Sequence, residues 1–175
     1  MVRKLSPKGT ENTLMKGYVR EATHADIQLV AQDMRDADVA EVMASSGWTS
    51  EQALINGLQT RETGGIIKTI CLPNDLPVGM FGVVPVGTPE VGAIWMLASN
   101  GLQAIHRQFA RQCRSEIDQI AEGYRLIFNF TDARNSLHHR WLQWSGFTII
   151  KRHERYGHEQ RPFLEFVKIT EKHDV

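Results

Sequence analysis

Cysteine is scarce in this sequence, and so are long apolar runs and any excess of charge of one sign. The two cysteines, Cys71 and Cys113, cannot form a disulfide framework and have no metal-ligand spacing. Twenty basic and twenty acidic residues leave no formal net charge, which argues against a dedicated nucleic-acid-binding protein. No apolar run reaches the roughly 18 residues of a membrane span, and the N-terminus lacks the apolar core of a signal peptide. We therefore expect a soluble protein of a reducing compartment, with no membrane segment.

What is present is the composition of an ordinary globular domain. The chain has 175 residues, of which 42% are apolar and 23% are charged. These values exclude disorder, collagen and coiled coil, and the length predicts one domain with a full hydrophobic core. Residues 1–16 are polar and show no periodicity. We therefore predict a flexible tail over 1–16 and a single domain over 17–175.

Short β-branched or apolar runs bounded by turn residues predict the strands. The run IIKTICL at 66–72, for example, lies between Gly64-Gly65 and the turn sequence Pro73-Asn74-Asp75, which predicts a hairpin with the next strand. Three consecutive strands in the middle of the chain predict a meander. The expected strands are residues 17–22, 66–72, 77–84, 91–98, 126–130, 148–152 and 162–169.

Apolar residues at helical spacing predict helices between these strands. Thr23 caps the first, with Asp26 three residues later as in a capping box. Gly47 ends the second, and Thr49 or Ser50 caps the third. The expected helices begin near residues 23, 36–38, 50, 102 and 136 and end near 34, 46, 58, 122 and 144. This order predicts a mixed α/β (α+β) fold, with a central mixed sheet of about six to seven strands flanked by helices.

The segment NSLHHRWLQWSGF, from Asn135 to Phe147, adds a recognisable motif to this order of elements. Asn135 can cap a helix, Gly146 can end it in a left-handed conformation, and Phe147 returns the chain to the core. The combination resembles the GNAT (Gcn5-related N-acetyltransferase) superfamily. The resemblance implies a cleft between the strands at 91–98 and 126–130. It also implies acetyl-CoA, with its pyrophosphate on backbone N–H groups of the loop after the first of these strands.

That loop, within SNGLQAIHRQFAR, departs from the family pattern. Active members have Gln/Arg-x-x-Gly-x-Gly/Ala, because a side chain would keep the pyrophosphate away from the backbone. The alignment puts Ala104, Arg107 and Phe109 at the Arg and Gly positions, and Gly101 is the only glycine in the stretch. The resemblance assigns acetyl-CoA, if it binds, to Leu97, Ala98, Asn100, Gly101, Leu102, Gln103, Ala104 and Asn135.

The catalytic positions of the family are replaced as well, so we assign no catalytic residue and no metal ligand. The family's proton-donating Tyr falls at Leu142, and its basic Glu falls at Trp95. General acid and base catalysis give about 10²–10⁴ each, so the loss of both predicts a poor acetyltransferase. His138, His139 and Glu90 are conceivable substitutes, but no constellation joins them.

The remaining notable residues favour structural interpretations. His138 and His139 are neighbours on a helix and point about 100° apart, so both are expected at the surface. Trp141 and Trp144, with Leu137, favour core packing over a partner-binding patch. A solvated helix face is favoured over a CoA or nucleic-acid site for the basic residues Arg107, Arg111 and Arg114.

A more specific resemblance covers about residues 18–169. The run WMLASN, the basic helix with FAR, and the pattern FNF…N…HxRWLxxxGF are similar to GNAT-like proteins of short-tailed bacteriophages. That group is associated with internal virion components and head morphogenesis. It implies a virion structural or assembly (internal core or ejection) component with eroded catalytic motifs, located in the host cytoplasm during assembly and in the virion interior, with other phage virion proteins as partners. The alternatives are an active acetyl-CoA-dependent N-acetyltransferase and a phage effector that binds a host protein through Trp141 and Trp144.

Overall fold

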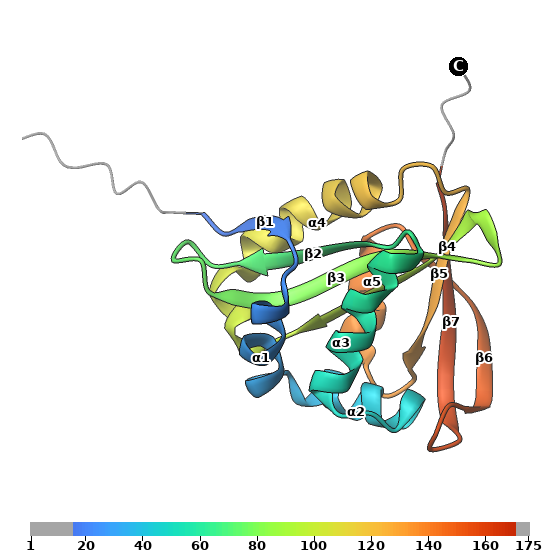
Figure 1. Cartoon of the computed structure of the whole chain (residues 1–175). Coiled ribbons are helices and arrows are strands. Elements are labelled where there is room, and N and C mark those ends of the chain that lie inside the picture. Colours follow the sequence, from blue (N-terminus) through green and yellow to red (C-terminus); the bar gives the residue numbers. More distant parts are fainter. Residues whose placement is uncertain (1–15, 171–175) are drawn as a thin grey trace, which may run out of the picture.

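A computed structural model describes residues 16–170 of the chain. In this range seven strands form one sheet in the order β1-β2-β3-β4-β5-β7-β6, and helices flank it (Figure 1). The strands are β1 (Tyr18–Glu21), β2 (Ile66–Cys71), β3 (Pro77–Val86), β4 (Thr88–Ala98), β5 (Leu126–Asp132), β6 (Thr148–Tyr156) and β7 (Arg161–Ile169). The helices are α1 (His24–Gln32), α2 (Asp36–Ser46), α3 (Ser50–Gln59), α4 (His106–Ile120) and α5 (Ser136–Trp144), with 3₁₀ helices η1 (Thr60–Thr63) and η2 (Asn100–Ile105). The predicted mixed α+β fold is confirmed.

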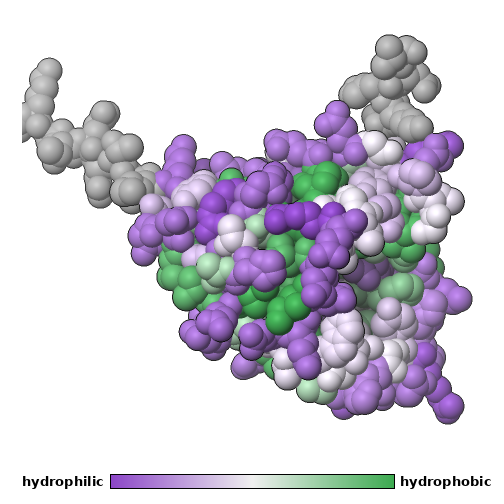
Figure 2. Space-filling model, in the orientation of Figure 1, coloured by the Kyte–Doolittle hydropathy of each residue, from purple (hydrophilic) through white to green (hydrophobic). Residues whose placement is uncertain are grey.

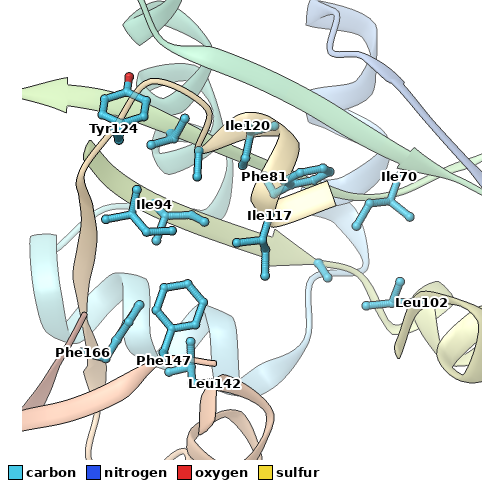
Figure 3. Close-up of a cluster of buried hydrophobic side chains, with 14 of the residues drawn as sticks. Ile70, Phe81, Ile94, Leu102, Ile117, Ile120, Tyr124, Leu142, Phe147 and Phe166 are labelled. Atoms are coloured by element: carbon cyan, nitrogen blue, oxygen red, sulfur yellow. The ribbon is translucent and has the colours of Figure 1, made fainter. Parts of the chain in front are cut away.

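The helices cover the sheet on two faces. On one face, α1 and α3 pack with side chains of β2 and β3 in a cluster that includes Val30, Leu54 and Met80. On the other face, α4 and α5 contribute Ile117 and Leu142 to the larger cluster, toward which side chains from the strands point in Figure 3. Strand side chains alternate between faces, so β4 supplies residues to both clusters. Within residues 16–170, the helices are too short or too polar to cross a membrane.

Local sequence signals explain most element boundaries. Thr23 and Asp26 form the predicted capping box at the start of α1, and Thr49 caps α3. Gly47 ends α2 with φ of +73°, a conformation that glycine adopts without steric cost. The predicted segment 1–16 lies outside the described residues except for Lys16, and the single domain over 17–175 stays a prediction.

The prediction of one long helix from about residue 102 to 122 was wrong in its first turn. Residues 100–105 form the 3₁₀ helix η2, and α4 begins only at His106. The Ser99 hydroxyl caps η2 by accepting the N–H of Gly101, and the Ser99 carbonyl accepts the N–H of Leu102. The Asn100 N–H and side chain are bonded to Asp33 before α2. These tertiary contacts determine the geometry of the turn, and helical periodicity does not reveal them.

Candidate functional site

The site begins where two parallel strands separate. β4 and β5 are paired only at Val91↔Leu126, Gly92↔Ile127 and Ala93↔Phe128. At the point of separation, the Asn129 side chain donates to the Ile94 carbonyl at 2.7 Å and takes the place of the next ladder bond. Beyond it β4 pairs only with β3, and β5 pairs with β7. The two strands therefore form a fork that is open toward their C-terminal ends.

Helix α2 bridges the arms of this fork. Asp38, in its first turn, accepts the N–H of Ala98 at the end of β4 at 2.8 Å, and it is also paired with Arg35. One turn later, Glu41 Oε2 accepts the Asp132 N–H at 2.9 Å and the Thr131 hydroxyl at 3.0 Å, both at the end of β5. The separation of the strands is thus held by two carboxylates on one helix.

Between these anchored points, β4 turns one peptide edge toward the fork. Backbone groups in an antiparallel ladder alternate between the paired strand and the opposite side. The Ile94 carbonyl and both backbone groups of Ala98 bond on the side away from β3. Met96 lies midway between these two residues and has the same orientation, so its N–H and C=O point into the fork. An N–H at this place is a ready donor to a carbonyl oxygen.

The fork opens into a cleft of about 530 Å³. Its walls come from both faces of the sheet, with α2 and α3 on one side and α4 and α5 on the other. Figure 2 shows that the molecular face carrying α1–α3 is mainly hydrophilic, with hydrophobic residues gathered near its centre. The cleft has the size of a small-molecule site. The lining residues used below are Glu41, Trp95, Met96, Phe109, Phe130, His138, Trp141 and Tyr156.

Glu41 is the titratable residue best suited to chemistry in this cleft. Burial raises the pKa of its carboxyl to about 7, although the hydrogen bonds from Asp132 and Thr131 lower it. Both bonds fall on Oε2, and Oε1 accepts no hydrogen bond from the described residues. A carboxylate with a pKa near neutrality can accept a proton and release it again. The sequence analysis did not identify Glu41.

Aromatic rings line the same cleft as this carboxylate. Phe130 stacks on Tyr156 with centroids 4.6 Å apart, and Tyr156 packs on Phe163 at 4.8 Å. The pKa of Tyr156 is raised by burial and by the negative charges of Glu165 and Glu41. Trp95, at the position of the family's basic Glu, lies against Gly57 of α3, where a Cβ would come within 2.5 Å of the indole ring. Three rings and one carboxylate suit an alkylammonium group.

The expectation that His138 lies at the surface was wrong. Its side chain lines the cleft, and its Nδ1 is buried without a hydrogen-bond partner among the described residues. Burial first, and then the positive charge of Arg35, lower the pKa of His138 to about 4, so the imidazole is neutral. His139 does turn elsewhere, toward the backbone carbonyl of Asp132. Glu90 is exposed at the other end of β4 and pairs with Arg125.

The two tryptophans of α5 do not share one environment. Trp141 stacks on Phe109 at 6.0 Å and lines the cleft, in line with the expected packing role. Trp144 is 45% exposed and lies beneath the guanidinium of Arg114, and Leu137 is 68% exposed. The prediction that Trp144 and Leu137 pack in the core was therefore wrong. Arg107, Arg111 and Arg114 are exposed as expected.

The residues predicted to hold acetyl-CoA are divided between the cleft, the core and the surface. Leu97 lines the cleft, Ala98 and Leu102 are buried, and Gln103 and Ala104 are exposed. Asn135 caps α5 by accepting the N–H of His138, as expected from the motif. The Leu142 side chain belongs to the core. The assignment of acetyl-CoA to Leu97, Ala98, Asn100, Gly101, Leu102, Gln103, Ala104 and Asn135 stays a prediction.

Comparison with known proteins defines the class of fold. No protein-family model and no curated sequence matches this chain. Among solved structures, a GCN5-related N-acetyltransferase from Kribbella flavida has a TM-score of 0.66 at 17% identity, over 87% of this chain and 97% of its own. Spermidine N-acetyltransferase from Vibrio cholerae has a TM-score of 0.64 at 9% identity, over 89% of this chain and 96% of its own. Ribosomal-protein-S5-alanine acetyltransferase from Vibrio fischeri has a TM-score of 0.62 at 15% identity, over 89% of this chain and 94% of its own. The chain therefore has the fold of the GNAT acetyltransferases.

Acetyl-CoA fits this site at one end only. The cleft and the Met96 N–H can receive an acyl thioester. The turn after β4 does not offer a pyrophosphate the open backbone cradle of the family, because η2 is a 3₁₀ helix whose N–H groups bond to carbonyls three residues earlier. Gly101 is explained by packing, since a Cβ there would come within 2.7 Å of Val78, and its N–H is bonded to Ser99.

Proposed function

We propose that the chain is an N-acyltransferase in which Glu41 deprotonates a primary amine and the Met96 N–H receives the acyl carbonyl oxygen. The observation that carries this proposal is Glu41, a half-buried carboxyl that lines the cleft, with a pKa of about 7 and with one oxygen held by the end of β5. A base of this pKa is half ionised at neutral pH and can accept the proton of an ammonium group.

The residues divide the reaction between them. Glu41 takes one proton from the ammonium, and the nitrogen lone pair then adds to the carbonyl carbon of the thioester. The Met96 N–H donates to the carbonyl oxygen, where negative charge develops. The C–S bond breaks, the nitrogen releases its second proton to water to leave the neutral amide, and the thiolate takes its proton from water, because Leu142 has none to donate. The thioester substrate supplies the activated acyl group.

The aromatic walls suggest which amines to test. Trp95, Phe130 and Tyr156 favour a cationic group with an apolar chain. The Vibrio cholerae neighbour was solved in complex with CoA and spermine, which makes spermine a reasonable first probe. Benzylamine provides a compact aromatic alternative.

The test is acyl transfer from acetyl-CoA and from S-acetylpantetheine to spermine and benzylamine, followed by thiol release. We expect the wild-type rate to rise with pH toward a plateau above about pH 7, and Glu41→Gln to lower kcat/KM about 10²–10³-fold. Glu51→Gln, an exposed substitution on α3, is the matched control and should leave the rate within about twofold. A Glu41→Gln variant with the wild-type rate and pH profile would refute the assignment.

A second candidate is a structural or assembly role in a bacteriophage particle, on a scaffold with eroded catalysis. The observation that favours it is the turn after β4, where η2 replaces a glycine-rich phosphate loop. Its partners would be other virion proteins, and its location would be the host cytoplasm during assembly and then the virion interior. It predicts that the chain co-sediments with phage particles and neither binds nor transfers an acyl thioester. Saturable binding of an acyl thioester would contradict the loss of cofactor binding that this candidate assumes.

A further inference from the structure

Most arginines of residues 16–170 are neutralised by a carboxylate of the chain itself. Seven of them form ion pairs with Asp or Glu, namely Arg20, Arg35, Arg61, Arg125, Arg134, Arg152 and Arg161. The arginines of α4 and α5 differ: Arg107, Arg111, Arg114 and Arg140 are exposed and form no ion pair with a described residue. Outside these two helices, Arg155 of β6 is the one described arginine in the same state.

The sequence gives the arginines of α4 and α5 no carboxylate nearby. Residues 91–115 and 133–153 contain neither Asp nor Glu, so all of α5 and the first ten residues of α4 lack an acidic side chain. Of the next acidic residues on α4, Glu116 lines the cleft and Asp118 pairs with Lys168 at 2.6 Å. The chain as a whole has no net charge. The two helices therefore present a local basic surface, which favours an acidic partner.

The basic residues share this surface with two apolar side chains. On α4 the arginines follow the spacing i, i+4, i+7, and on α5 Leu137, Arg140 and Trp144 follow i, i+3, i+7, so each set lies on one face of its helix. Arg114 joins the two faces, because its guanidinium lies 4.3 Å from the Trp144 ring centroid and donates to the Trp144 carbonyl. We call this the α4–α5 surface, made of Arg107, Arg111, Arg114, Leu137, Arg140 and Trp144.

Leu137 and Trp144 have the largest exposed fractions among the large apolar side chains of the described helices. They are seven residues apart, which is about two turns or 10 Å along α5. Apolar side chains at this spacing, flanked by charges, are typical of a helix that packs against another helix. None of the six residues of the α4–α5 surface lines the cleft, so the surface is separate from the site of the proposed chemistry.

The same residues favour a protein over a nucleic acid as the partner. Proteins that bind single strands stack bases on open aromatic rings, whereas one face of the Trp144 ring is covered by Arg114. Leu137 has no ring on which a base could stack. An aliphatic side chain beside guanidinium groups matches a helix that carries apolar residues and carboxylates on one side.

We propose that the α4–α5 surface binds an acidic amphipathic helix of a partner protein. Leu137 and Trp144 contact the apolar side chains of that helix, and the four arginines pair with its carboxylates. The inference goes beyond the proposed acyl transfer and does not depend on it, since neither Glu41 nor Met96 takes part.

The experiment is a fluorescence-anisotropy titration of a labelled synthetic peptide with the full chain. The peptide has about three heptads, with Leu at every seventh position, Glu at the flanking positions and Ala elsewhere, and a control peptide has Lys in place of Glu. We expect the acidic peptide to bind with a dissociation constant of about 1–100 μM and to lose about tenfold in affinity between about 50 and 300 mM NaCl. The Lys peptide should not bind.

Variants of the chain connect this binding to the α4–α5 surface. Arg111→Glu should weaken the acidic peptide at least about tenfold, and Leu137→Ser about three- to tenfold. Arg155→Glu makes the same change at the unpaired arginine of β6, so it is the matched control and should stay within about twofold. All three side chains are exposed, and circular dichroism should show the wild-type fold in each variant.

Three results would overturn the inference. The first is the absence of binding at about 1 mM acidic peptide, which lies well above the expected dissociation constant. An equal loss of affinity in Arg111→Glu and Arg155→Glu would mean that only the overall charge matters. Tighter binding of an oligothymidine strand than of the acidic peptide would assign the surface to a nucleic acid.

Discussion

Asp38 and Glu41 lie one turn apart on α2 and bind opposite arms of the β4–β5 fork. Asp38 accepts the N–H of Ala98 at 2.8 Å, and Glu41 accepts the N–H of Asp132 at 2.9 Å. One short helix therefore both holds the strands apart and presents a carboxylate to the cleft between them. The structure of the fork and the chemistry of the site depend on the same helical turn.

Removal of the Asp38 carboxylate should weaken the fold markedly. Asp38→Ala leaves the buried Ala98 N–H without an acceptor and the Arg35 guanidinium without its partner, so we expect a loss of about 2–4 kcal/mol in the free energy of unfolding. Urea denaturation followed by circular dichroism measures it. Asn100→Ala removes an exposed contact to Asp33 at the same end of β4 and should cost less than about 1 kcal/mol. Equal costs for the two variants would show that Asp38 is no anchor.

The raised pKa of Glu41 predicts a pH-dependent gain in stability from Glu41→Gln. The carboxyl has a pKa of about 7 in the folded chain against an ordinary value of 4.5, so the folded state holds its proton more tightly than the unfolded state. The wild type therefore loses stability as pH rises from about 4.5 to 7, by at most about 3 kcal/mol. Glutamine stays uncharged and can still accept the bonds from Thr131 and Asp132.

Urea denaturation at pH 5 and pH 8 tests this expectation. Glu41→Gln should be more stable than the wild type at pH 8, and most of the difference should vanish at pH 5. The exposed Glu51→Gln should show no such dependence. A Glu41→Gln variant that is less stable at pH 8 than at pH 5, relative to the wild type, would contradict the raised pKa.

Elements whose signals are local could be predicted from the sequence. Thr23 and Asp26 are three residues apart, and Gly47 directly follows the helix that it ends. Asn135 and Gly146 likewise mark both ends of α5. In each case the residues that determine the boundary lie within or beside the element, so spacing alone identifies them.

The site depends on contacts that spacing cannot reveal. Glu41 resembles any acidic residue on a short helix until Thr131, 90 positions away, is seen to hold it. Asn100 belongs to a 3₁₀ turn because its side chain bonds to Asp33, 67 positions earlier. His138 was expected at the surface because one helix cannot show which of its faces meets the fork. Packing between distant segments determines all three.

We expect that Gly57 is needed because a larger residue would collide with the indole of Trp95, and not because helix α3 itself needs a glycine. In the interior of α3, alanine would normally be better than glycine by about 0.5–1 kcal/mol. A Cβ at Gly57, however, would come within 2.5 Å of Trp95 Cζ2, so Gly57→Ala should destabilise the chain by about 1–2 kcal/mol net. In a Trp95→Leu background, which removes the ring, the same change should become stabilising.

Gly57→Ala in the wild-type and in the Trp95→Leu background forms a double-mutant cycle, and urea denaturation measures the free energy of unfolding of each variant. The predicted reversal of sign depends on the Trp95 ring alone, since the helix is the same in both backgrounds. If Gly57→Ala is equally harmful in the Trp95→Leu background, the cost comes from another contact, and Trp95 is not positioned by α3.

Gly157 joins the β6–β7 turn to the end of α2, and its replacement should be far more harmful than that of Gly87. Both glycines have positive φ, +64° and +69°, so alanine has a similar backbone cost of about 1–2 kcal/mol at each. Nothing lies within 4 Å of a Cβ at Gly87, whereas a Cβ at Gly157 would come within 2.5 Å of the Ser45 carbonyl oxygen.

The clash would also separate the turn from α2, because the N–H groups of His158 and Glu159 bond to the carbonyls of Ser45 and Ala44 at 3.0 Å. We expect Gly157→Ala to cost about 1–3 kcal/mol more than Gly87→Ala in urea denaturation. Since α2 carries Glu41 and β6 carries Tyr156, acyl transfer to spermine should fall in Gly157→Ala and not in Gly87→Ala. Equal stability of the two variants would mean that the turn does not pack on α2, and α2 would then not fix the position of Tyr156 in the cleft.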